Sequence, residues 1–151
     1  MKYLALMITF ILSVSFQSAF GGEPVLTIET ETEKVSFKRS ELLKRKDLEE
    51  VVIKKDPAYP GGQRKYKAIK VIHLFKNIKH SEAAIVLFKA TDGFSAPLSK
   101  ARLLANSPKE SMAYLAIEPA EKKWPSLKKG GLSAGPFYLV WKNPKFSQIG
   151  Q

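Results

Sequence analysis

The sequence predicts a single compact α+β domain that is rich in β-strands and has only short helices. Strand-like apolar segments outnumber helical ones, and loops rich in proline and glycine separate them. No internal repeat or low-complexity block interrupts this alternation. Hydrophobic residues make up 44% of the 151 residues and include nine phenylalanines, so we expect a packed core rather than disorder.

The N-terminal segment has the pattern of a signal peptide. Lys2 precedes an apolar run over residues 3–16, and small residues follow it. The run is shorter than the roughly 20 residues that span a bilayer, and an uncleaved membrane anchor is the alternative. We predict a signal peptide over residues 1–21, cleaved after Gly21, which leaves residues 22–151 as one domain. The mature protein is then exported, periplasmic or secreted, and has no transmembrane segment.

The first half of this domain is predicted to alternate short strands with one helix. The strands are expected at residues 25–30, 34–37 and 48–53. A helix of one or two turns is expected over 40–46, with Ser40 available as its cap and Glu41 in its first turn. Residues 54–65, KKDPAYPGGQRK, form a long loop because two prolines and paired glycines prevent regular structure there.

A hairpin is predicted in the middle of the domain. Residues 66–78 fit a strand that enters a short helix, and residues 83–90 are apolar enough for a central strand. The Asp92-Gly93 pair indicates a two-residue turn, because glycine accepts the positive φ that such a turn demands. Pro97 lies late in the returning strand and is tolerated at a sheet edge.

The last third closes the fold. Residues 98–107 have the leucine spacing of a small helix, and residues 112–118 form another strand. A loop over residues 119–135 leads into a final strand over residues 136–141.

Charge and cysteine content exclude several functions. The net charge is +11, or +10 after the signal peptide is removed, which favours anionic partners. The lysines are scattered, so a solvated basic surface and attraction to an acidic protein, ligand or lipid surface both stay open. No nucleic-acid recognition motif is present, and we expect no nucleic-acid partner. The chain has no cysteine, which excludes disulfides, attached c-type haem, thiolate metal sites and cysteine nucleophiles.

Five segments in order resemble the molybdopterin-binding domain of the sulfite oxidase family of oxidoreductases. They are FKRSELLKR, YKAIKVIHLF, IVLFKATDGFSAPLSKARLL, MAYLAIE and GGLSAGPFYLVW. The resemblance covers most of the mature chain. It implies a sulfite-oxidase molybdopterin-domain-like fold and a cleft able to hold molybdopterin.

The metal-binding position departs from that family. Its enzymes place a molybdenum-ligating cysteine on the strand after the first helix, where this chain has Lys54, Lys55 and Asp56. An ammonium cannot replace a soft thiolate, and a lone carboxylate is a different ligand. We therefore expect no metal, no cofactor and no catalytic residue.

A nucleophile-elbow pattern, GLSAG, places Ser133 in the position of a hydrolase nucleophile. An elbow needs a strand before the serine and a helix after it, and no Asp, Glu or His follows Ser133 here. His73, flanked by apolar residues, is expected to be a structural histidine. Glu118, followed by proline, is expected to mark a strand end.

The candidate ligand-binding surface combines the two long loops, which border the pterin pocket in the resembled family. Arg and Lys suit phosphate or carboxylate groups, and Tyr or Trp can cover a flat ring. Aromatic loop anchors with solvated cations are the alternative. The candidate residues are Asp56, Tyr59, Arg64, Lys65, Trp124, Lys128, Lys129 and Ser133.

Two functions follow from this. The first is an exported, non-catalytic binding or accessory partner of a redox system, with a c-type cytochrome as the partner that the family context implies. The alternative is a molybdopterin-dependent oxidoreductase that uses a cysteine-free cofactor site.

Overall fold

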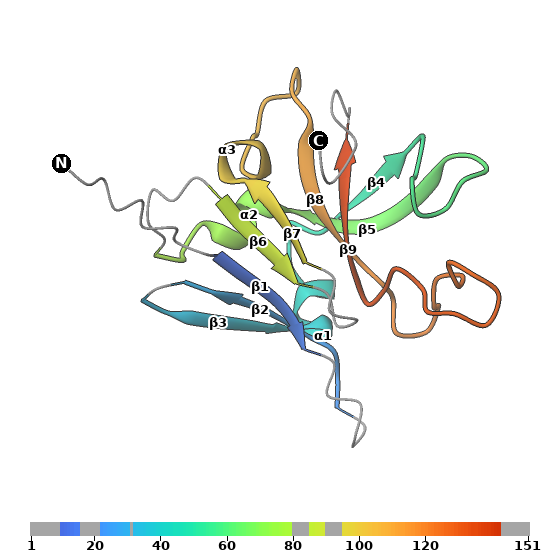
Figure 1. Ribbon diagram of the computed structural model, residues 1–151, viewed down its shortest axis with the longest axis horizontal. Coiled ribbons are helices and arrows are strands. Elements are labelled where there is room, and N and C mark those ends of the chain that lie inside the picture. Colours follow the sequence, from blue (N-terminus) through green and yellow to red (C-terminus); the bar gives the residue numbers. More distant parts are fainter. Residues whose placement is uncertain (1–9, 16–21, 31, 80–84, 90–94, 143–151) are drawn as a thin grey trace.

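The computed structural model describes residues 10–15, 22–30, 32–79, 85–89 and 95–142. Within them lie nine strands and three short helices (Figure 1). The strands are β1 Phe10–Ser15, β2 Val25–Glu29, β3 Lys34–Lys38, β4 Glu49–Ile53, β5 Arg64–Lys70, β6 Ile85–Lys89, β7 Ser95–Ser99, β8 Met112–Ile117 and β9 Phe137–Lys142. The helices are α1 Arg39–Leu43, α2 Val71–Phe75 and α3 Lys100–Leu103. The predicted α+β class, rich in strands with short helices, is confirmed.

The strands form two sheets. Sheet A has the order β3-β2-β1-β6-β7, and sheet B has the order β4-β5-β8-β9. All pairings are antiparallel except that between β1 and β6. Sheet A and the helices lie on one side of sheet B, and the long β8–β9 loop extends on the other side of the molecule (Figure 1).

Strand β8 is buried on both faces, which explains its continuous apolar sequence. Ala113, Leu115 and Ile117 point into the larger core, with side chains from sheet A and the helices. The alternate residues Met112, Tyr114 and Ala116 point into a second core on the outer face of sheet B. This second core includes loop residues, so the long loops cover the outer face.

The helices are short segments with one buried side. In α2, Val71, Leu74 and Phe75 are buried, at the spacing of one helical face. Helix α1 buries Leu42, and the Glu41 carboxylate accepts the Lys38 N–H at 2.9 Å.

The expectation that Ser40 caps α1 is wrong. Ser40 lies inside the first turn, and the residue before the helix is Lys38. The Ser40 hydroxyl instead donates to the Glu23 carboxylate at 2.9 Å. That carboxylate lies 17 positions earlier in the chain, and local spacing gave no signal for the contact.

The hairpin between β6 and β7 is confirmed, and Pro97 lies on β7 at the edge of sheet A, where a missing N–H is tolerated. Lys89 pairs with Ser95, and the Asp92-Gly93 turn lies outside the described residues. The two-residue turn therefore stays a prediction.

Strand β1 lies within the segment expected to be a signal peptide. Its backbone pairs with β2 on one side and with β6 on the other. Cleavage after Gly21 stays a prediction, and it would remove the strand that joins β2 to β6.

Candidate functional site

The two loops named from the sequence meet on the outer face of sheet B, and Tyr59 joins them. Its hydroxyl donates to the Pro125 carbonyl at 2.9 Å and accepts the Ala134 N–H at 2.8 Å. Tyr59 is buried within the β4–β5 loop, residues 54–63, and its two partners belong to the β8–β9 loop, residues 118–136. One phenol thus fixes two segments that are far apart in the sequence.

Asp56 is the centre of a buried hydrogen-bond network. Its Oδ1 accepts the backbone N–H groups of Ala58 at 2.9 Å and Tyr59 at 3.3 Å, and the Tyr138 hydroxyl at 3.0 Å. Its Oδ2 accepts the Tyr66 hydroxyl. With 5% of its surface exposed and four donors around it, the carboxylate is satisfied within the protein.

The two phenols bonded to Asp56 are held in their protonated form. Burial raises the pKa of Tyr66, and its hydrogen bond to the Asp56 carboxylate raises it further. Burial also raises the pKa of Tyr138, with the negative charge of Asp56 as the next cause. Both hydroxyls therefore remain donors to Asp56 across the physiological pH range.

Trp124 packs against this network instead of presenting a free face. Its ring lies edge-on to Tyr66, with centroids 5.1 Å apart, and to Tyr138, with centroids 6.4 Å apart. On the same side, the Arg64 guanidinium lies 4.5 Å from the centre of the Tyr59 ring. These contacts identify the aromatic residues as loop anchors.

Glu118 is a second buried carboxylate, at the end of β8, and its sequence context indicated only a strand end. It accepts the Trp124 N–H at 2.7 Å and lies 3.4 Å from the Ser133 hydroxyl. Ser133 also accepts the Gly135 N–H at 3.1 Å. A Cβ added at Gly135 would lie 2.7 Å from the Glu118 carboxyl, so glycine allows this close approach.

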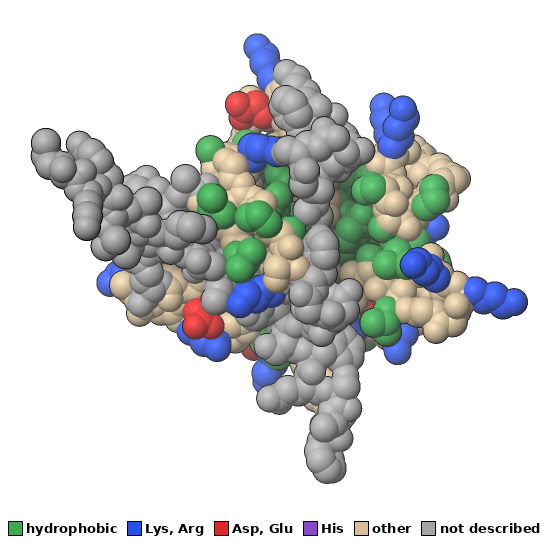
Figure 2. Space-filling view, viewed as in Figure 1, with side chains coloured by type: hydrophobic (Ala, Val, Ile, Leu, Met, Phe, Trp, Pro, Cys, Tyr) green, Lys and Arg blue, Asp and Glu red, His purple; other side chains and the backbone are tan. Residues whose placement is uncertain are grey.

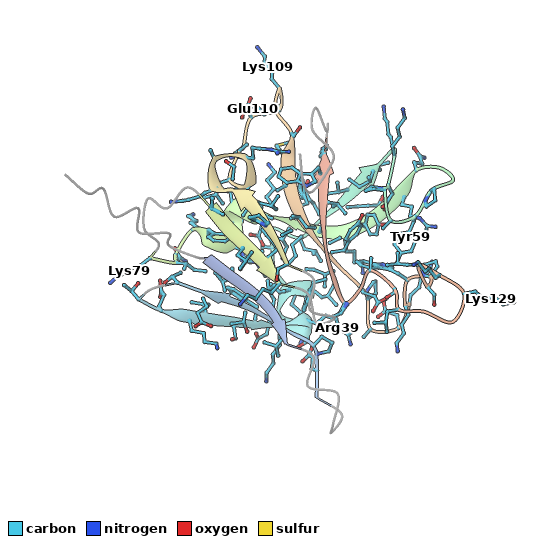
Figure 3. All side chains as sticks on the ribbon, in the orientation of Figure 1. Arg39, Tyr59, Lys79, Lys109, Glu110 and Lys129 are labelled. Carbon is cyan, nitrogen blue, oxygen red and sulfur yellow. The ribbon has the colours of Figure 1, made fainter. Side chains whose placement is uncertain are left out.

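The three lysines of the predicted site lie on the surface. Lys65 pairs with Glu50 at 3.0 Å, and both side chains are exposed. Lys128 and Lys129 are exposed at the tip of the β8–β9 loop, where Figure 3 shows Lys129 pointing away from the protein. The structure therefore brings Asp56, Tyr59 and Ser133 into the loop junction and leaves these lysines outside it.

A second polar cluster was missed by the sequence reasoning. Arg45 makes two hydrogen bonds to Asp47, from Nε to Oδ1 at 2.8 Å and from Nη2 to Oδ2 at 2.6 Å. His73 Nδ1 lies 3.3 Å from the same Oδ2, and the His73 side chain is 38% exposed. His73 lies on the partly exposed side of α2, and the expected structural histidine, packed or hydrogen-bonded, is a partly exposed partner of Asp47.

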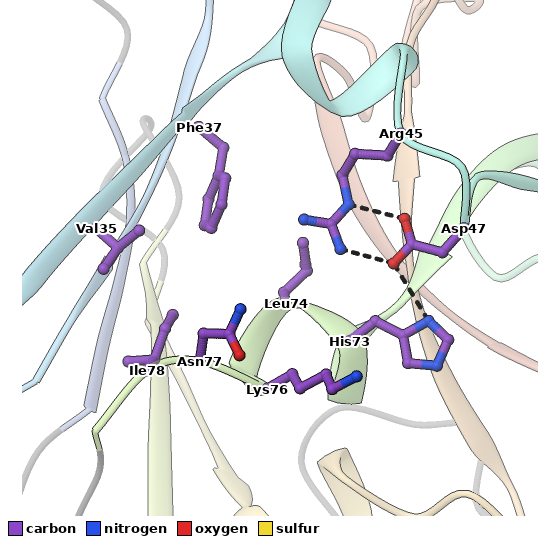
Figure 4. Close-up of a pocket in the computed structure, with 9 residues that line it drawn as sticks. All are labelled: Val35, Phe37, Arg45, Asp47, His73, Leu74, Lys76, Asn77 and Ile78. Atoms are coloured by element: carbon purple, nitrogen blue, oxygen red, sulfur yellow. Dashed lines mark hydrogen bonds and ion pairs between the residues drawn. The ribbon is translucent and has the colours of Figure 1, made fainter.

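The cluster borders a pocket of about 450 Å³ between β3, the α1–β4 connection and α2 (Figure 4). The pKa of Asp47 is lowered, chiefly by its hydrogen bond to Arg45. Asp47 therefore stays ionised and holds Arg45 and the His73 ring in place.

No protein-family model, curated protein or solved structure matches the chain. In the described part of the chain, no helix is long and apolar enough to cross a membrane. The same part contains no group of three or more His, Cys, Asp or Glu side chains arranged to hold a metal ion.

Proposed function

We propose that the chain is an exported, non-catalytic accessory domain that binds an acidic redox protein, such as a c-type cytochrome, on the side where the two loops meet. The proposal includes a fold like the molybdopterin-binding domain of the sulfite oxidase family. The bridge formed by Tyr59 carries the proposal, because it holds the cations of both loops on one side of the molecule.

The charges of the two loops support an acidic partner. Asp56 and Glu118 are buried, so Glu121 is the exposed carboxylate of these loops. Figure 2 shows lysine and arginine side chains spread around this side of the molecule, with apolar side chains between them. Such a surface accelerates association with an acidic protein. Complementary charge of this kind raises the association rate more than it raises the affinity. The loop cations are Lys54, Lys55, Lys122, Lys123, Lys128 and Lys129, and Arg64 and Lys65 follow on β5, where Lys65 pairs with Glu50 of β4.

The test is the affinity for an acidic c-type cytochrome of the native host, measured by calorimetry at low and high salt. Reversing Lys128 and Lys129 to glutamate should weaken binding by roughly tenfold at low salt, because like charges then face the partner. Reversing Lys79 and Lys109 gives the same net charge on other sides of the molecule (Figure 3) and should have a much smaller effect. Equal loss in both variants would mean that net charge alone attracts the cytochrome.

The absence of catalysis is tested by metal analysis. The resemblance implies that the family's thiolate position lies near two exposed lysines, Lys54 and Lys55, and near Asp56, whose oxygens are already hydrogen-bonded. We expect no stoichiometric molybdenum and no sulfite oxidase activity in protein from a host that makes the cofactor, with a cysteine-containing relative as the positive control. One molybdenum per chain, retained through gel filtration, would favour the cysteine-free oxidoreductase.

Export is tested by mass spectrometry of protein from the native host. We expect a mature N-terminus at Gly22, because the apolar run is short and small residues follow it. The exported chain would then lack β1, so amides of β2 and β6 that face it should exchange faster than in the uncleaved chain. An intact Met1 in a cytosolic fraction would contradict export.

A further inference from the structure

The pocket beside Asp47 lies apart from the proposed partner surface and uses none of its residues. Strand β3 forms one wall, the α1–β4 connection forms the opposite wall, and α2 with the residues after it forms the base (Figure 4). Its volume of about 450 Å³ is within the range typical of small-molecule sites, roughly 300–1,000 Å³.

The polar side of the pocket is fixed by ion pairing. Arg45 uses Nε and Nη2 for Asp47, and its remaining nitrogen points away from Asp47 toward the pocket (Figure 4). His73 faces Asp47 through Nδ1, which orients the ring. A guanidinium held in this way needs no reordering before it donates to a ligand.

The opposite side is apolar. Val35 and Phe37 of β3 face the pocket together with Ile78, and Leu74 lies at its base (Figure 4). Val35 and Phe37 are only partly buried, although they pack against the larger core. Their remaining exposed surface is apolar area that a ligand can cover.

The charges around the pocket favour a ligand that carries a negative charge. Asp47 is the lining carboxylate, and it is already paired with Arg45. Lys76 adds a cation that extends along the base toward His73 (Figure 4). The lining therefore carries more positive than negative charge, at the end opposite the apolar wall.

We propose that this pocket binds a small organic carboxylate with an apolar body. The carboxylate lies between the free nitrogen of Arg45 and the Lys76 ammonium, and the apolar body lies against Phe37 and Ile78. A small carboxylate without an apolar chain would leave the apolar wall exposed to water. An apolar ligand without a carboxylate would leave the free Arg45 nitrogen without an acceptor.

The test is calorimetry of the full chain with octanoate, octan-1-ol and acetate. Octanoate carries both a carboxylate and an apolar chain, whereas octan-1-ol lacks the carboxylate and acetate lacks the chain. Octanoate should bind at least about tenfold more tightly than either comparison compound, because only octanoate uses both sides of the pocket. Nuclear magnetic resonance of the His73 ring and of Phe37 should show shifts with octanoate.

Variants then locate the binding. Arg45→Lys keeps a cation beside Asp47 and loses the third nitrogen, so octanoate affinity should fall about tenfold. Lys76→Gln should weaken it about threefold, whereas Lys79→Gln, an equal charge change outside the pocket, should leave it unchanged. Thermal unfolding of each variant confirms that the fold is intact.

Three results would overturn the proposal. Octan-1-ol or acetate binding as tightly as octanoate would show that the pocket does not recognise an amphipathic anion. Equal weakening by Lys76→Gln and Lys79→Gln would show that binding depends on overall charge. Octanoate binding without shifts at His73 and Phe37 would place the ligand elsewhere. Since the cytochrome test reverses Lys128 and Lys129, which do not line the pocket, either proposal can fail alone.

Discussion

Asp56 and Asp47 are the centres of two polar clusters that differ in burial. Asp56 is 5% exposed and accepts four hydrogen bonds, two from backbone N–H groups and two from phenols. The Asp47 side chain is 26% exposed and is held by the Arg45 guanidinium and the His73 ring. The groups that donate to Asp56 occupy both of its oxygens. Arg45, by contrast, keeps one nitrogen that is not bonded to Asp47 and faces the pocket.

This difference separates a structural carboxylate from one that prepares a binding site. A buried carboxylate persists only when its oxygens are satisfied, and once satisfied it has no capacity left for a ligand. A partly exposed carboxylate contributes less to stability, but it can orient cations that still reach solvent. Each of the following experiments tests that contrast.

The largest expected effect is the loss of the Asp56 carboxylate. Asp56→Ala should lower the free energy of unfolding by roughly 3 kcal/mol or more, because two phenols and two N–H groups lose their acceptor. Asp47→Ala is the matched control and should cost roughly 1 kcal/mol or less. Urea denaturation of both variants measures the difference, and equal losses would contradict the contrast.

A smaller effect is expected from the bridge between the loops. Tyr59→Phe removes both hydrogen bonds to the β8–β9 loop and should cost about 1–2 kcal/mol. It should also speed tryptic cleavage at Lys122, Lys123, Lys128 and Lys129, which that loop exposes.

Tyr114→Phe is the control for this loop effect. Burial raises the pKa of Tyr114 to about 12, with the negative charge of Glu49 as the next cause. Glu49 is the first residue of β4, at the opposite end of that strand from the β4–β5 loop. This variant should lose stability without faster cleavage of the β8–β9 loop. Unchanged cleavage in Tyr59→Phe would show that the phenol does not hold the loops together.

The stability of the protein at acid pH should depend on the ion pair of Asp47 with Arg45. Because the folded-state pKa of Asp47 is lowered, its stabilising contribution is present above the ordinary aspartate pKa of about 3.9 and is lost as pH falls through the folded-state value. The difference in stability between the natural protein and Asp47→Asn should therefore shrink as pH falls below about 4. Chemical denaturation from pH 7 to pH 3 measures it, and a difference that does not change with pH would argue against the ion pair.

The smallest expected effect belongs to the surface pair between Lys65 and Glu50. Both side chains are more than half exposed, so solvent screens their attraction. Lys65→Gln should change the free energy of unfolding by less than about 0.5 kcal/mol, as measured by thermal unfolding. A loss comparable with that of Tyr59→Phe would mean that exposed charge matters more to this fold than the buried network.

Much of the fold could be predicted because its signals are local. The apolar run of β8, the leucine spacing around α3 and the proline and glycine residues after β4 each act within a few residues. Ser40 shows the limit of that reasoning. Its type and position suited a helix cap, but its partner is Glu23, and spacing within the helix cannot reveal that contact.

The candidate site was predicted in part. The family resemblance gave convergence of the two loops only as one alternative, and Asp56, Tyr59 and Ser133 lie at their junction. It did not indicate that the aromatic and acidic groups satisfy one another there. The pocket was missed because Arg45 and Asp47 follow α1 while His73 lies on α2, in segments with no shared motif.

By itself the sequence determined the α+β class, the order of short strands and helices, the loops between them and the absence of a thiolate ligand. Periodicity and turn residues act over a few neighbouring residues, and composition is a property of the chain itself. All three can therefore be read without knowing which distant segments come together. Only the tertiary structure decided that Asp56 is saturated and Asp47 is not. Burial and the number of donors around a carboxylate depend on side chains brought together from distant segments, such as Tyr138 beside Asp56 and His73 beside Asp47.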